Sequence, residues 1–119
     1  MNDTIVLFRP IGPRELELIA ASGWTAFPPR LPEQPIFYPV LNEDYARQIA
    51  RDWNVKESGR GFVVRFRLPK AFLDPFEVQQ VGGRKHLEYW IPAERLADLN
   101  AAILGLIELI AEFPPAPGE

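Results

Sequence analysis

The chain has 119 residues, of which 47% are hydrophobic and 12% aromatic, enough for one hydrophobic core and too few for two ordinary domains. Its formal net charge is −3 and it has no basic run, which argues against nucleic acid as the main partner. It contains no cysteine, which excludes disulfides, thiolate metal sites and cysteine nucleophiles.

No apolar run approaches the roughly 20 residues that a membrane-spanning helix needs, and no signal-peptide pattern opens the chain. We therefore expect a soluble cytoplasmic protein that does not associate with membranes. Residues 1–113 are expected to form a single α+β domain, and residues 114–119 a disordered C-terminal tail.

The first third of the chain predicts two strands and one helix. Thr4–Phe8 is β-branched and apolar, which predicts a short buried strand followed by a turn. Pro13–Ser22 predicts a helix, because proline is tolerated in the first turn and an apolar stripe runs as far as Gly23. Ile36–Val40 predicts a strand at an edge or bulge, since the internal Pro39 cannot donate a ladder hydrogen bond.

A proline-rich loop joins this helix to the second strand. Phe27–Val40 (FPPRLPEQPIFYPV) places five prolines around Arg30 and Tyr38. Each proline fixes its own φ and biases the preceding residue toward extended geometry, so the loop is stiff without regular secondary structure. We expect it to hold Arg30 and Tyr38 beside a ligand site with little loss of entropy on binding. The alternative is that the loop covers an edge of an aromatic core.

The middle of the chain predicts a helix and a strand. Asn42 can cap a helix in which apolar residues recur at a spacing of four as far as Trp53. Asn54–Gly61 is expected to be a flexible connector. Phe62–Leu68 alternates apolar residues with polar ones, which predicts a strand that is buried on one face.

The last third predicts a hairpin, a helix and a closing strand. Phe76–Val81 and Arg84–Ile91 are strand-like and are separated by a glycine pair, a hairpin signal. A helix is expected after Pro92, and residues 106–113 favour a strand over a longer helix. The order of elements indicates an α+β fold with a curved, mostly antiparallel sheet and about three helices.

Several polar residues stand out on the predicted strands. His86 and Glu88 lie two apart and so share a face, as a general base or hydrogen-bonding pair requires, although a solvated strand face is the simpler alternative. Arg65 and Arg67 either pair with strand carboxylates such as Glu77 or line a pocket for an anion. The single histidine has no partner at metal-ligand spacing, so no metal is expected.

Four segments that together span nearly the whole chain carry a family resemblance: LFRPIGPRELELI, FPPRLPEQPIFYPVLNEDYARQIARDWN, FEVQQVGG and EYWIPAERL. On these segments the chain resembles a group of short uncharacterised bacterial proteins labelled "ADP-ribosylation/crystallin J1". The resemblance implies an ADP-ribosyltransferase-like fold, NAD as cofactor and transfer of ADP-ribose to an acceptor. In that fold a first strand carries an arginine or histidine, a second carries a tyrosine or serine, and a later strand supplies an acidic residue.

Arg9, Tyr38 and Glu88 follow that order. By the resemblance, Arg9 would hold the NAD pyrophosphate or ribose and Tyr38 would stack on nicotinamide. Glu88 would bind the ribose 2′-hydroxyl and stabilise the oxocarbenium-like state. The candidate catalytic residues are thus Glu88, Tyr38 and His86, and the candidate cofactor-binding residues are Arg9, Arg30 and Arg65.

Two alternatives stay open. The protein could be a non-catalytic interaction protein of the immunity or antitoxin type, with Trp24 or Trp90 in an exposed apolar patch. It could also be a domain in which Arg30, Arg65 and Arg67 bind a nucleotide or other small anion without turnover. The enzyme hypothesis predicts that its three key side chains share one cleft, and the interaction hypothesis predicts that they lie apart or in buried ion pairs.

Overall fold

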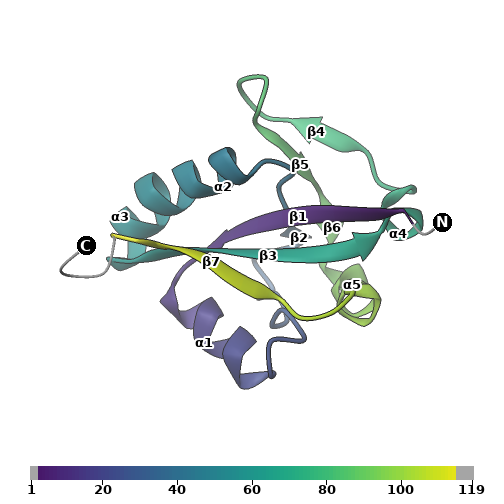
Figure 1. Ribbon diagram of the computed structural model, residues 1–119, viewed down its shortest axis with the longest axis horizontal. Helices are drawn as coiled ribbons and strands as arrows, with labels where there is room; N and C mark the ends of the chain where they lie inside the picture. Colours follow the sequence, from purple (N-terminus) through teal and green to yellow (C-terminus); the bar gives the residue numbers. More distant parts are fainter. Residues whose placement is uncertain (1–2, 115–119) are drawn as a thin grey trace.

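A three-stranded antiparallel sheet forms the centre of the protein, here a computed structural model that describes residues 3–114. Its strand order is β1 (Thr4–Ile11), β3 (Gly61–Pro69), β7 (Glu108–Phe113), with β3 in the middle (Figure 1). The β1–β3 register opposes Arg9 to Val64 and the neighbouring Phe8 to Arg65. Because side chains alternate along a strand, Arg9 and Arg65 therefore project from opposite faces of the sheet.

Helices cover both faces of this sheet (Figure 1). Helix α1 (Pro13–Ala21) packs on one face, where its fully buried Ile19 joins the main hydrophobic core. Helix α2 (Glu43–Ile49) packs on the other face, where Ala46 joins Val63 of β3 in a second, smaller core.

The predicted cap of α2 is confirmed, because the Asn42 side chain accepts a hydrogen bond of 3.1 Å from the Tyr45 backbone N–H. The expected flexible connector is wrong. The helix continues through a π-helical segment (Ala50–Asn54) and α3 (Val55–Ser58). It ends at Gly59, whose φ of +81° is one that glycine adopts without strain.

Two short strand pairs complete the sheets. β2 (Ile36–Phe37) pairs with β6 (Ile91–Pro92), and β4 (Val78–Gln80) pairs with β5 (Leu87–Tyr89) in the predicted hairpin. The other helical segments are short: α4 (Lys70–Leu73), a 3-10 turn (Ala93–Arg95) and α5 (Leu96–Ala102).

The segment around Val40 links the central sheet to the β4–β5 hairpin through backbone bonds. Val40 exchanges two backbone hydrogen bonds with Phe8 of β1, of 2.7 and 2.8 Å, and forms a bridge to Glu88 of β5. The residues on either side of Val40 bond to the β5 backbone. Val40 thus lies between β1 and β5, and the backbone of Glu88 is separated from β1 by this one chain segment.

The α+β class with mainly antiparallel strands is confirmed, as one compact domain. The predicted turn after Phe8 is wrong, because β1 continues through Pro10 to Ile11. The predicted strand over 36–40 shortens to β2 and the Val40 bridge, and the closing strand is confirmed as β7. Residues 115–119 of the expected tail lie outside the described residues. Within 3–114, no helix has the length and apolar character required to cross a bilayer.

Candidate functional site

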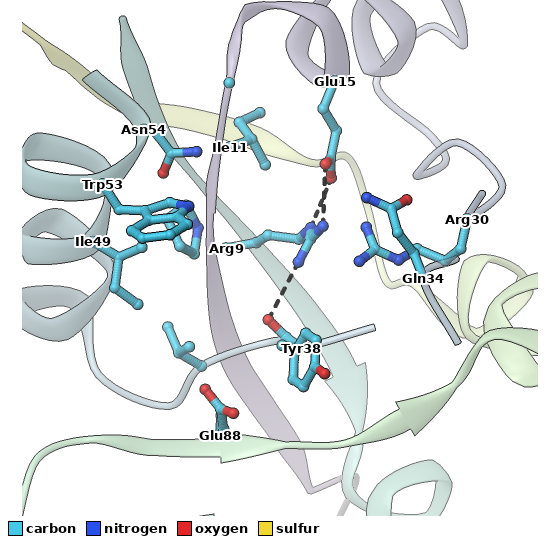
Figure 2. A pocket seen from close by; sticks show the side chains of 13 residues that line it. Arg9, Ile11, Glu15, Arg30, Gln34, Tyr38, Ile49, Trp53, Asn54 and Glu88 are labelled. Atoms are coloured by element: carbon cyan, nitrogen blue, oxygen red, sulfur yellow. Dashed lines mark hydrogen bonds and ion pairs between the residues drawn. The ribbon is translucent and has the colours of Figure 1, made fainter. Parts of the chain in front are cut away.

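A pocket of about 420 Å³ opens beside the C-terminal half of β1 (Figure 2). Its walls bring together four of the six predicted site residues: Arg9, Arg30, Tyr38 and Glu88. They come from β1, from the proline-rich loop, from the residue after β2 and from β5. Side chains far apart in the sequence therefore share one cavity, as the enzyme hypothesis requires.

The pocket lies at a gap in the sheet. Phe8 and Val40 form a hydrogen-bonded antiparallel pair, so the polar groups of Pro10, two residues on, face the same edge of β1. Continuing this register would oppose Pro10 to Tyr38, but proline has no N–H to donate. The Tyr38 carbonyl instead accepts a bond of 3.4 Å from Nη1 of Arg9. The loop separates from β1 here, and the pocket occupies the space between them.

Arg9 is only 7% exposed and is already paired. Its Nε and Nη2 donate to the two carboxylate oxygens of Glu15, at 2.7 and 3.1 Å, in the two-pronged geometry that favours arginine over lysine. The guanidinium also lies over the buried Phe37 ring, 4.3 Å from its centroid. Glu15 and Phe37 therefore fix Arg9 and neutralise much of its charge.

Arg30 is the pocket's less compensated cation. Its Nε donates to the Ile36 carbonyl at 3.2 Å, and within residues 3–114 no carboxylate lies within ion-pair distance of it. Partial burial lowers the pKa of Arg30 from its ordinary value, and the nearby charge of Arg9 lowers it further. An arginine remains protonated despite such a shift, so Arg30 offers a positive charge to an incoming anion.

Glu88 is a buried carboxylate at the edge of the pocket. It is 9% exposed, and its Oε1 accepts a hydrogen bond of 2.7 Å from the indole Nε1 of Trp90. The Trp90 ring in turn meets Tyr38 edge-on, with ring centroids 6.4 Å apart. Glu88 is held by one directed bond, and in Figure 2 its carboxylate lies beside Tyr38.

The structure does not bring His86 or Arg65 to this pocket. His86 stacks on Tyr45, with ring centroids 4.4 Å apart, and its Nδ1 accepts a bond from the Gly83 N–H in the hairpin loop. Arg65 and Arg67 both bond to Glu108, at 3.1 and 3.0 Å, rather than to Glu77. These two bonds lower the pKa of the Glu108 carboxyl, with Arg65 the larger cause.

Sequence reasoning missed three residues of the site. Glu15 was interpreted as a charge at the N-terminus of a helix, yet from the first turn of α1 it also pairs with Arg9. Trp53 fitted a helical apolar stripe, but Ala46 and Ala50 form the buried face and Trp53 is 60% exposed at the pocket. Trp90 directly follows β5 and lies two residues after Glu88, and that spacing, which places alternate residues of an extended chain on one side, could have been used to identify it.

Two carboxylates, Glu15 and Glu88, line the pocket. No group of three or more metal-ligating side chains occurs within residues 3–114. The available chemistry is that of one buried carboxylate, two arginines, a tyrosine and a tryptophan.

Comparison with known proteins gives no assignment: no family model matches the chain, and no curated protein or solved structure does either.

Proposed function

We propose that this pocket binds NAD and that the protein transfers the ADP-ribosyl group from NAD to an acceptor. One observation carries the proposal: Arg9, Tyr38 and Glu88 line a single pocket and follow the order of elements found in ADP-ribosyltransferases. The pocket volume of about 420 Å³ falls within the usual range of small-molecule sites.

Each wall of the pocket suits one part of NAD. Arg30 can donate charge-assisted hydrogen bonds to the pyrophosphate. Arg9 uses three of its five N–H groups on Glu15 and the Tyr38 carbonyl, which leaves two for a ribose or phosphate oxygen. The Tyr38 ring, partly exposed, offers a surface on which nicotinamide can stack.

Glu88 would act on the reacting carbon. In the reaction the bond between ribose C1′ and the nicotinamide nitrogen breaks, and its electron pair leaves with the neutral nicotinamide. A fixed carboxylate stabilises the positive charge that develops on the ribose ring, and stabilisation of this kind contributes about 10²–10³-fold to rate. The acceptor then bonds to C1′ and loses its proton to Glu88 or to water.

Calorimetry with NAD and ADP-ribose tests the binding half of this proposal. We expect Arg30→Ala to weaken binding about 10- to 150-fold, because a hydrogen bond to a charged group contributes roughly 1.5–3 kcal/mol. Arg9→Ala should also lose affinity. Arg65→Ala is the matched control, since it removes an arginine from the opposite face of the sheet and should leave binding unchanged.

Release of nicotinamide from NAD, followed by chromatography, tests the chemical half. Glu88→Gln should keep its affinity for ADP-ribose and lose nicotinamide release by about 10²–10³-fold. Absence of any binding heat from the wild-type protein at millimolar ligand would contradict the proposal.

A second candidate is binding of a small anion without turnover. The observation that favours it is the pairing of Arg9 with Glu15, which leaves Arg30 as the main cation for a ligand. This candidate predicts that Arg30→Ala weakens binding of ADP-ribose and that wild-type protein releases no nicotinamide from NAD. The exposed Trp90 and the paired Arg9 also match part of the interaction-protein hypothesis.

A further inference from the structure

The pocket has two chemically different sides (Figure 2). Arg30 and Gln34 lie on one side, near the Arg9–Glu15 pair. Ile49, Trp53 and Asn54 lie on the other side of β1, and these three described residues carry no charge. Tyr38 and Glu88 lie between the two sides in this view.

Trp53 dominates the uncharged side. At 60% exposure it is the most exposed aromatic side chain of the described residues, and a large indole left in water at a pocket wall is a common feature of a binding surface. The amide of Asn54 lies beside it, and Oδ1 of this amide is buried without a hydrogen-bond partner in residues 3–114.

The backbone under Trp53 is irregular but firmly held. Trp53 belongs to the π-helical segment Ala50–Asn54, in which the Val55 N–H bonds to the Ala50 carbonyl five residues earlier. Segments of this kind occur frequently at functional sites. The backbone of Gly61 passes so close that a Cβ there would collide with the Ala50 carbonyl oxygen and lie 2.9 Å from Cβ of Asn54. The strand therefore fixes the turn that presents Trp53.

We propose that the side formed by Ile49, Trp53 and Asn54 receives the acceptor of the transfer, and that the acceptor presents a flat, uncharged ring there. This inference rests on the proposed function. The donor's phosphates belong on the Arg30 side, because that arginine is the available cation, and the reacting carbon belongs beside Glu88. The acceptor must then approach from the side that is still open, which is the Trp53 side.

The chemistry of this side selects the acceptor class. A flat ring gains about 1–3 kcal/mol by stacking on an aromatic side chain. A carboxylate acceptor would find no counter-charge on Trp53, Ile49 or Asn54, and a lysine or arginine side chain would find the indole face but no carboxylate on these residues. The nucleophile is therefore an N–H or O–H on the ring; it bonds to ribose C1′, nicotinamide leaves with the electron pair, and the proton passes to Glu88 or to water.

Nuclear magnetic resonance of the tryptophan indole N–H groups tests the inference, with adenosine as the uncharged ring and ADP-ribose as the ligand of the donor side. We expect about 10 mM adenosine to shift the Trp53 indole signal, since stacking plus one hydrogen bond gives a Kd near 1 mM. The shift should persist when ADP-ribose is bound. In the Trp53 variants, which lack this indole, the side-chain amide signal of Asn54 reports binding. Trp53→Phe should keep part of the affinity, Trp53→Leu should lose it, and Leu106→Ala, an exposed apolar change away from the pocket, should leave it intact.

The outcomes separate the inference from the proposed function. If ADP-ribose binds through Arg30 but displaces adenosine, or if adenosine leaves the Trp53 signal unmoved, the assignment of the Trp53 side to the acceptor is wrong. The proposal that the pocket binds NAD is then unaffected. If ADP-ribose does not bind at all, the proposed function fails and the acceptor assignment fails with it. An adenosine shift that is independent of ADP-ribose supports the inference.

Discussion

The hydrogen bond from Trp90 to Glu88 is the most specific residue-scale feature of the pocket. Glu88 is buried, and a buried carboxylate without donors is costly, so this bond of 2.7 Å decides where its oxygens lie. Trp90 itself is 44% exposed, so part of its ring lies in solvent while its N–H group is bonded to Glu88. We regard Trp90 as a positioning residue for Glu88.

A double-mutant cycle in urea denaturation measures this bond. Trp90→Phe keeps a ring beside Tyr38 and removes the N–H, so we expect a loss of about 1–3 kcal/mol of unfolding free energy. The same change in a Glu88→Gln background should cost less by about 1 kcal/mol, because a neutral amide needs the donor less than a carboxylate does. Equal costs in the two backgrounds would mean that the charge of Glu88 does not strengthen the bond.

The sequence identified the side chains of the pocket better than their partners. Arg9, Tyr38 and Glu88 could be found because each is a polar residue in or next to an apolar strand. Glu15 and Trp53 could not be assigned, because both fit an ordinary helix pattern and only the packing of the helix on the sheet decides which face is buried. Tertiary contacts, which no single-sequence pattern contains, make that choice.

At the scale of elements, the proline-rich loop contributes both to the main core and to the pocket. Phe27 and Phe37 are buried in the main core, whereas Arg30 and Tyr38 line the pocket. The loop therefore covers a core edge with its aromatic residues and holds two polar side chains at the site. A loop anchored at two buried rings needs little regular structure to position what lies between them.

The π-helical segment is the element whose disturbance should be easiest to detect. We expect Gly61→Ala to destabilise the protein by about 1–3 kcal/mol, because the added methyl group collides with the Ala50 carbonyl and a packed backbone cannot yield freely. Urea denaturation measures the loss, and the indole signal of Trp53 should shift in the same variant. Gly83→Ala is the control, since a Cβ there meets only ordinary contacts with His86.

If Gly61→Ala proved as stable as Gly83→Ala, the strand would not hold the π-helical segment, and the fixed position of Trp53 would lose its explanation. The sequence did not predict this segment. Its residues are compatible with an α-helix, and the wider turn becomes apparent only from the approach of β3.

For the whole molecule, we expect the central strand β3 and the β4–β5 hairpin to differ in stability. The central strand β3 is mostly buried, while β4 is largely exposed and pairs with β5 over only three residue pairs. Regions with few buried contacts open locally at a lower free energy than global unfolding requires.

Amide hydrogen exchange should reveal this difference. We expect the amides of Val78–Gln80 to exchange at least about 100-fold faster than those of Val63 to Phe66. Exchange in the hairpin needs only a local opening, whose free energy is lower than that of global unfolding, which is about 5–15 kcal/mol. A bound ligand that contacts Glu88 should slow exchange in β5. Equal exchange rates in the hairpin and in β3 would instead indicate a single cooperative unit.

The class of the fold was predictable and its connections were not. Alternating residues in β3 and the glycine pair of the hairpin are local signals. Strand β3 formed as expected, whereas the hairpin formed with its strands shortened to Val78–Gln80 and Leu87–Tyr89. The reduction of 36–40 to a two-residue strand and one bridge depends on which strands lie beside it, which is a property of the assembled sheets.

Pro10 limits the strand pairing at one edge of the central sheet. Small domains normally gain stability from each strand pairing that their geometry permits. Here the pairing between β1 and the loop is limited to Phe8 and Val40, because Pro10 has no N–H group to donate. An ordinary residue at that position could let the strands close and fill the cavity with backbone. The absence of an N–H group on Pro10 thus leaves the strand pairing incomplete, and the pocket lies at the position of the missing pair.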